Sequence, residues 1–218
     1  MISDEELAAA VAAFWSSRVG GTQSATHDKA FLELLARELE GLGWPAHISR
    51  YASDPGALVG GHFRPAKAWD IVCRDSEDRP RICVEFKSQV DSYGNNENNR
   101  YEEALGSGID ARAGHGANLT LGFFLVLCEE DATSRPTRER IADGDPIFAQ
   151  SSHVDRRAIF ARRLVAFRVN DVPFYDAAAL LLVHRDGTYR SLDDPAIDVR
   201  TFAERLAESA RSRSPGFG

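Results

Sequence analysis

The feature that most constrains the fold is a nearly continuous apolar run, Leu-Thr-Leu-Gly-Phe-Phe-Leu-Val-Leu, at residues 119–127. Side chains alternate between the two sides of a sheet, so a strand that is apolar at successive positions is buried on both faces. We therefore expect this run to lie in the middle of a mixed β-sheet. The sequence predicts an α/β fold, with a small mixed sheet flanked by helices on both sides.

A second pattern, at residues 68–87, predicts two antiparallel strands. Its arms, Ala-Trp-Asp-Ile-Val-Cys and Arg-Ile-Cys-Val-Glu-Phe-Lys, are rich in residues that suit half-buried strands. A polar turn sequence separates the arms. If Asp70 lies opposite Glu85, then Asp75 lies opposite Pro80 and residues 76–79 form a four-residue loop, which is a common hairpin length.

This register places three charged side chains on one face of the hairpin. Glu85 and Lys87 share a face because they are two positions apart, and Asp70 lies opposite Glu85 with the Cβ atoms about 5 Å apart. Two carboxylates at that distance repel each other unless a cation lies between them. Oxygen ligands with room for waters suit Mg²⁺, and the Phe86 carbonyl is a further candidate ligand. With Lys87 beside a metal, the pattern indicates phosphodiester hydrolysis, although Glu-x-Lys also occurs on ordinary charged hairpins.

The residues around this triplet resemble a known family. They are Phe-Arg-Pro-Ala-Lys-Ala-Trp-Asp at residues 63–70 and Glu-Phe-Lys-Ser-Gln-Val-Asp-Ser-Tyr-Gly-Asn-Asn-Glu-Asn-Asn-Arg-Tyr-Glu-Glu-Ala-Leu-Gly-Ser-Gly at residues 85–108. Both segments resemble the XhoI family of type II restriction endonucleases, which belongs to the PD-(D/E)xK nuclease superfamily. The resemblance covers residues 60–130 well and extends more loosely to about residue 205. It implies a restriction-endonuclease-like core.

The resemblance also implies an activity. Asp70, Glu85 and Lys87 are then the catalytic residues, with Mg²⁺ as the cofactor. The expected substrate is double-stranded DNA, cut at the palindrome CTCGAG to leave 5′-phosphate ends with a 5′ overhang. A homodimer is expected because a two-fold protein matches a palindromic site, and a cognate DNA methyltransferase is the expected functional partner. The alternatives are a nuclease of other specificity, directed at repair or at modified DNA, and a non-catalytic DNA-binding module on this fold.

Further site residues follow from the resemblance and from residue chemistry. Nucleases of this superfamily often supply another acidic metal ligand from an early helix, and here the candidates are Glu33, which we prefer, and Glu38. Solvent-exposed acids on a helix surface are nevertheless common. Asn pairs with adenine and Arg with guanine in the major groove, while Asn also favours turns and helix caps. The candidate DNA contacts are Gln89, Asn95, Asn96, Asn98, Asn99, Arg100, Arg64 and Lys67.

The remaining chain predicts one domain over residues 1–218, with a core at about 28–130 and a C-terminal helical part at about 150–212. The arginine-rich helix expected at residues 154–169 is a candidate phosphate-tracking face or a solvated helix face. The other expected elements are helices at residues 3–15, 28–40, 96–113 and 198–211, a buried apolar helix at 173–183, and short strands at 47–51 and 187–193.

Charge and cysteine content limit the classes of protein. The net charge of −7 argues against a general nucleic-acid binder, although a basic cleft can lie on an acidic body. Three cysteines make no disulfide framework, and the hairpin register places Cys73 and Cys83 on opposite faces. The N-terminal residues do not resemble a signal peptide, and no apolar run is long enough to span a membrane. We expect a cytoplasmic protein.

Overall fold

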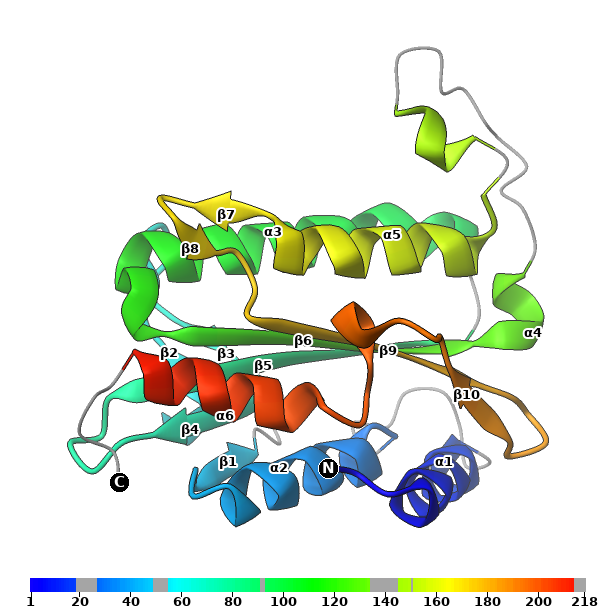
Figure 1. Ribbon diagram of the computed structural model, residues 1–218, viewed down its shortest axis with the longest axis horizontal. Helices are drawn as coiled ribbons and strands as arrows, with labels where there is room; N and C mark the ends of the chain where they lie inside the picture. Colours follow the sequence, from blue (N-terminus) through cyan, green and yellow to red (C-terminus); the bar gives the residue numbers. More distant parts are fainter. Residues whose placement is uncertain (19–26, 49–54, 91–92, 134–144, 150, 214–218) are drawn as a thin grey trace.

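The computed structural model describes residues 1–18, 27–48, 55–90, 93–133, 145–149 and 151–213, except for the side chains of residues 94–97. Its centre is a six-stranded mixed sheet with helices on both faces (Figure 1), which confirms the predicted fold class. β5, β6 and β9 are parallel, and the other pairs are antiparallel. In spatial order the strands are β1 (Ala46–Ile48), β4 (Ile71–Arg74), β5 (Pro80–Gln89), β6 (Thr120–Cys128), β9 (Ala177–Val183) and β10 (Tyr189–Ser191).

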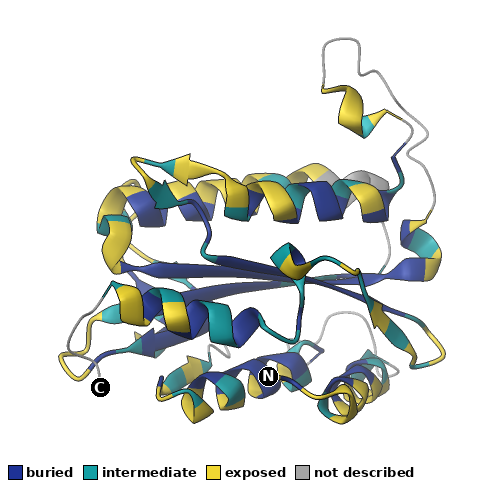
Figure 2. Cartoon of the chain, viewed as in Figure 1, coloured by how far each residue is buried: buried dark blue, intermediate teal, exposed yellow. Residues whose placement is uncertain are grey.

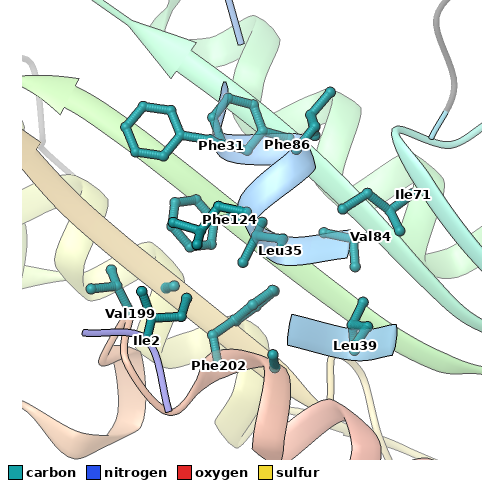
Figure 3. Close-up of a cluster of buried hydrophobic side chains, with 14 of the residues drawn as sticks. Ile2, Phe31, Leu35, Leu39, Ile71, Val84, Phe86, Phe124, Val199 and Phe202 are labelled. Carbon is teal, nitrogen blue, oxygen red and sulfur yellow. The ribbon is translucent and has the colours of Figure 1, made fainter. Parts of the chain in front are cut away.

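Two helical layers bury the two faces of the sheet. α1 (Asp4–Arg18), α2 (Lys29–Gly41) and α6 (Phe202–Ser212) cover one face, which we call the α2 face. α3 (Tyr93–His115) and α5 (His153–Ala166) cover the other, the α3 face. The strands β6 and β9 are buried along their whole length, and β5 is buried in its middle (Figure 2). Each face therefore has its own hydrophobic cluster, and Figure 3 shows the one on the α2 face.

β6 is the central strand that the apolar run predicted. All nine of its residues are buried, between β5 and β9. Gly122 allows α6 to approach the strand closely, because a Cβ at this position would lie 2.8 Å from Cζ of Phe202 and 3.0 Å from Cδ1 of Leu206. α6 therefore buries β6 and also packs closely against it at Gly122.

The predicted helix at residues 173–183 is wrong. The structure has a short strand β8 (Val172–Pro173) and then β9, whose sequence Ala-Ala-Ala-Leu-Leu-Leu-Val is buried throughout. Alanine and leucine favour helices, and periodicity cannot separate a short buried strand from a buried helix. Pairing with β6 on one side and β10 on the other decides the outcome.

The hairpin follows the predicted register over most of its length. Ile71 pairs with Val84, and Cys73 pairs with Ile82. The predicted turn is wrong, because the register shifts after Cys73 and Pro80 pairs with Arg74 rather than with Asp75. Asp75 instead closes the turn, since its Oδ1 accepts the backbone N–H groups of residues 77 and 79 at 2.9 and 3.0 Å.

The smaller elements complete the chain. The predicted strand at residues 47–51 corresponds to β1, and residues 49–51 lie outside the described part. None of the described helices is both long and apolar enough to cross a bilayer. The short elements are β2 (Leu58–Val59) paired with β3 (Lys67–Ala68), β7 (Arg168–Val169) paired with β8, α4 (Glu129–Ala132), and the 3₁₀ helices η1 (Pro55–Ala57), η2 (Gly116–Asn118), η3 (Pro146–Phe148) and η4 (Pro195–Ile197).

Candidate active site

Asp70 lies immediately before β4, where the hairpin begins. Its backbone N–H donates to the Val84 carbonyl at 3.1 Å, and its side-chain Oδ2 accepts the backbone N–H of Phe86 at 2.8 Å. The Asp70 carboxylate therefore accepts a backbone N–H that a backbone carbonyl would otherwise accept in the β4–β5 ladder. This bond fixes the orientation of the Asp70 side chain against β5.

Glu85 lies in the middle of β5 on the α3 face. Its side chain is only 1% exposed. Oε1 lies 3.2 Å from Nζ of Lys87 and 3.3 Å from Nζ of Lys67. Oε2 is buried and has no hydrogen-bond partner among the described residues. A buried acceptor without a partner is costly, so the free oxygen is a favourable position for a cation.

The environment of Asp70 disfavours the ionised form of its carboxyl group beside the carboxylate of Glu85. Burial raises the pKa of the Asp70 carboxyl above its ordinary value, and the neighbouring Glu85 adds to this effect. The ammonium groups of Lys87 and Lys67 act in the opposite direction without cancelling the shift. The two carboxylates therefore interact electrostatically, as the sequence predicted, and a bound divalent cation would relieve their repulsion.

Lys87 is held by acidic groups from two elements. Burial alone would lower the pKa of its ammonium, but Glu85, Asp70 and Glu103 outweigh burial and raise that pKa above its ordinary value. Glu103 lies on α3, with Oε2 3.8 Å from Nζ of Lys87 and 2.6 Å from a terminal nitrogen of Arg100. Sequence reasoning missed Glu103, because nothing in the sequence shows that this turn of α3 lies over β5.

The donor set fits Mg²⁺. Asp70 and Glu85 supply carboxylate oxygens, and no group of three or more His, Cys, Asp or Glu side chains that could hold a metal converges within the described residues. Mg²⁺ usually binds one or two carboxylates and keeps several waters, so two acids are sufficient. The side chain of Phe86 points to the α2 face, where its ring stacks 5.7 Å from that of Phe31. Its carbonyl remains a predicted ligand.

The structure does not bring Glu33 to this site. α2 covers the opposite face of the sheet, and Glu33 is exposed on it in an ion pair with Lys29 at 3.3 Å. The apolar residues of α2 face the sheet and leave Glu33 in solvent. The residue that adds a further carboxylate to the surroundings of Lys87 is Glu103 on the α3 face.

Gln89, a predicted DNA contact, lies on the α3 face and is buried rather than turned to solvent. Its Oε1 accepts a hydrogen bond from Arg157 of α5 at 2.8 Å. The guanidinium of Arg157 also lies 4.5 Å from the centre of the Tyr101 ring. Gln89 therefore joins β5 to α5, and the structure does not support a direct role in DNA contact.

The other predicted DNA contacts are exposed asparagines, asparagines outside the described part, and cations paired with carboxylates. Asn98 and Asn99 are exposed on α3, whereas the side chains of Asn95 and Asn96 lie outside the described part of the chain. Arg100 is paired with Glu103. Arg64 donates to Asp110 of α3 at 2.7 Å, so it anchors the segment before β3. Lys67 forms an ion pair with Glu85 at 3.3 Å.

The arginine-rich helix is α5, and its arginines have protein partners. Arg162 pairs with Asp194, and Arg163 pairs with Asp145. Arg156 donates to the hydroxyl of Ser151. These contacts favour the interpretation as a helix bound to neighbouring segments over that of a free phosphate-tracking face.

Comparison with known proteins identifies the family. The family model described as restriction endonuclease XhoI matches residues 15–191. The type II restriction enzyme BstVI of Geobacillus stearothermophilus is 28% identical over 187 residues, covering 79% of this chain and 80% of BstVI. The type II restriction enzyme AbrI of Azospirillum brasilense is 38% identical over 97 residues, covering 40% of this chain and 41% of AbrI.

A third relative is the type II restriction enzyme XhoI of Xanthomonas vasicola. It is 31% identical over 121 residues, covering 51% of this chain and 48% of that enzyme. No solved structure matches the chain. Because the family model spans most of its length, the chain belongs to the XhoI family of restriction endonucleases. This finding confirms the predicted resemblance.

Proposed function

We propose that the chain is a Mg²⁺-dependent type II restriction endonuclease that hydrolyses phosphodiesters of double-stranded DNA at a palindromic site. The expected site is CTCGAG, with 5′-phosphate ends and a 5′ overhang. The observation that carries the proposal is the buried Glu85. Its Oε1 binds two lysines, its Oε2 has no partner among the described residues, and Asp70 interacts with it. Family membership supports DNA as the substrate.

The residues divide the chemistry between them. Asp70 and Glu85 would hold the metal ion through carboxylate oxygens, and the Phe86 carbonyl is a third candidate ligand. When bound, Mg²⁺ polarises a phosphoryl oxygen and makes a water more acidic. The Lys87 ammonium is positioned beside Glu85 to orient the attacking water and to balance charge on the phosphate. Charge stabilisation and alignment are the main contributions that a protein makes to phosphoryl transfer.

Biological context extends the proposal. A homodimer would place two equivalent sites on the two strands of a palindrome. A cognate methyltransferase would protect the host's own copies of that site. The three cysteines are all buried and free, which agrees with the reducing cytoplasm that we propose as the location.

The first test is digestion of unmodified phage DNA with Mg²⁺, followed by sequencing of the fragment ends. Wild type is compared with Glu85→Gln and with the matched control Glu33→Gln, which changes an exposed glutamate on the opposite face. We expect identical fragments ending at CTCGAG from wild type and E33Q, and no cleavage by E85Q.

Other outcomes discriminate the alternatives. Fragments with ends at another fixed sequence would support the mechanism and reject CTCGAG. Cleavage only of methylated DNA would favour a nuclease for modified DNA. Binding of DNA without metal-dependent cleavage of either substrate would favour the non-catalytic module.

A further inference from the structure

Lysine is rare in this chain. It contains three lysines, Lys29, Lys67 and Lys87, and 23 arginines. Arginine is the usual cation even in buried ion pairs, such as the one between Arg112 and Asp176. Two of the three lysines nevertheless contact the same oxygen of Glu85. Because the two cations differ in geometry more than in charge, this placement indicates that the site requires compact ammonium groups.

Lys67 reaches Glu85 from the separate two-stranded sheet formed by β2 and β3. It lies on β3, opposite Val59 of β2, whereas Lys87 lies on β5 with Glu85 itself. The Lys67 side chain is 16% exposed, and its Nζ lies 4.9 Å from the centre of the buried Trp69 ring. The local fold therefore buries a second cation beside Glu85. Burial of a charge is unfavourable unless partners compensate, and here Glu85 and Trp69 are the partners.

The difference between lysine and arginine matters for the free oxygen of Glu85. Two ammonium groups contact Oε1 and leave Oε2 without a hydrogen-bond partner among the described residues. A guanidinium usually binds both oxygens of a carboxylate through two parallel hydrogen bonds. An arginine at position 67 would therefore occupy the oxygen that a metal ion needs.

The formal charges at the centre also limit the number of metal ions. Asp70 and Glu85 carry two formal negative charges, and Lys67 and Lys87 carry two positive charges. The charge of Glu103 beside Lys87 is balanced by its ion pair with Arg100. One divalent ion would give a net positive centre that attracts a phosphate. A second would meet repulsion from the first ion and from both lysines.

We propose that Lys67 is a second lysine of the catalytic centre, and that the centre takes one divalent ion. Lys67 fixes Oε1 of Glu85 and supplies at the phosphate the positive charge that a second metal ion provides in two-metal sites. The role at the phosphate rests on the nuclease function proposed above. The role at Glu85 is independent of it, because a lysine there weakens metal binding whether or not DNA is cleaved.

The test uses Lys67→Met and Lys67→Arg, with Lys29→Met as the matched control. Lys29 is the remaining lysine, and it is exposed on α2. In single-turnover cleavage at saturating Mg²⁺, we expect K67M to lose about 100-fold in rate because it lacks one charge at the transition state. DNA affinity measured with Ca²⁺ should change much less, and K29M should match wild type in both.

Metal binding without DNA gives a second readout. Calorimetry with Mn²⁺, which binds the same oxygen ligands as Mg²⁺, should show one ion per chain in wild type. K67M should bind it at least about threefold more tightly because a competing charge is gone, whereas K67R should bind it more weakly. A merely structural role for Lys67 does not predict tighter binding in K67M. Thermal unfolding of each variant checks that it is folded.

Three results would overturn the proposal. They are a K67M cleavage rate close to that of wild type, metal binding in K67M that is unchanged or weaker, and two ions per chain. If wild type cleaves no DNA, the nuclease function fails, while the order of metal affinities among K67M, wild type and K67R still decides whether Lys67 competes for Glu85. K67R alone suffices for the metal test if K67M does not fold.

Discussion

Single side chains hold the segments that surround the site. Asp110 of α3 is the clearest case, because its Oδ1 accepts the backbone N–H of Phe63 at 2.6 Å and its Oδ2 accepts Nε of Arg64 at 2.7 Å. Gly61 allows this approach, since a Cβ there would overlap the Asp110 carboxylate. The segment that leads to Lys67 is therefore fastened to the helix that carries Glu103.

Asp110→Asn should destabilise the fold by about 1–3 kcal/mol at neutral pH, because it weakens charge-assisted hydrogen bonds to a buried group. Although burial alone would raise the pKa of Asp110, hydrogen bonds from Phe63 and Arg64 hold that pKa below its ordinary value. The ionised carboxylate therefore stabilises the fold above the ordinary aspartate pKa, and this stability is lost as the pH falls through the lower folded value.

Urea unfolding across acidic and neutral pH measures this difference, with Glu102→Gln on the exposed side of the same helix as control. The gap between wild type and D110N should close in acid. A gap that persists well below the folded pKa would contradict the assignment to the charged form.

Local periodicity was enough to predict the grouping of Asp70, Glu85 and Lys87, because strand alternation and hairpin pairing are short-range. The position of Lys67 depends on how β2 and β3 fold back onto β5, and that of Glu103 on how α3 crosses β5. The spacing of residues along the sequence predicts neither of these two positions. Gln89 meets Arg157, which is 68 positions away in sequence, and no local pattern indicates that contact.

At the scale of elements, the packing of helices on the sheet depends on a few close fits. α6 lies against β6 where Gly122 leaves room for Phe202 and Leu206. α3 begins at Tyr93, whose hydroxyl lies within hydrogen-bond distance of the carbonyl oxygens of both Gln89 and Cys128, at 2.6 and 2.8 Å. The ends of β5 and β6 therefore fix the start of the helix that passes over the candidate site.

Gly122→Ala should destabilise the protein by about 1–3 kcal/mol, because the added methyl group overpacks the contact with α6. Phe202→Leu in the same chain should recover part of the loss. Gly106→Ala is the matched control, since a Cβ there meets nothing within 4 Å and should stabilise α3 by about 0.5–1 kcal/mol. Thermal unfolding distinguishes the destabilisation expected for Gly122→Ala from the stabilisation expected for Gly106→Ala. Equal effects of the two substitutions would contradict the packing argument.

The contact between Gln89 and Arg157 should couple β5 to α5. Gln89→Met removes an acceptor from a buried guanidinium and should cost about 1–3 kcal/mol in free energy of unfolding. The double variant with Arg157→Met should lose less than the two single variants combined, with a coupling energy of about 1–2 kcal/mol. A double-mutant cycle in urea measures this coupling, and strict additivity would show that the contact contributes nothing.

Elements were predictable where a pattern was unambiguous. The amphipathic helices and β6 follow from periodicity and from continuous apolarity. β9 did not, because its Ala-Ala-Ala-Leu-Leu-Leu-Val sequence favours a helix until the neighbouring strands are in place. The turn at Asp75 was also missed. The predicted register continued the strand pairing to residue 75, whereas the Asp75 side chain accepts the backbone N–H groups of residues 77 and 79.

For the whole molecule, the net negative charge and the proposed palindromic substrate lead to one expectation. A chain with net charge −7 gains affinity for a polyanion by doubling its specific contacts rather than by general attraction. Sedimentation equilibrium should therefore give about twice the 24.0 kDa chain mass at concentrations that support cleavage. A monomer under cleaving conditions would contradict the homodimer.

The scarcity of lysine also has a practical consequence. Reagents that couple to primary amines have few targets on this protein, and of the lysines only Lys29 is well exposed, at 51%. Lys29 lies on α2, across the sheet from the candidate site. Attachment to a surface or a dye through Lys29 or the N-terminal amine would therefore leave the α3 face, which carries the candidate site, open, and this suits single-molecule recordings of the protein on DNA.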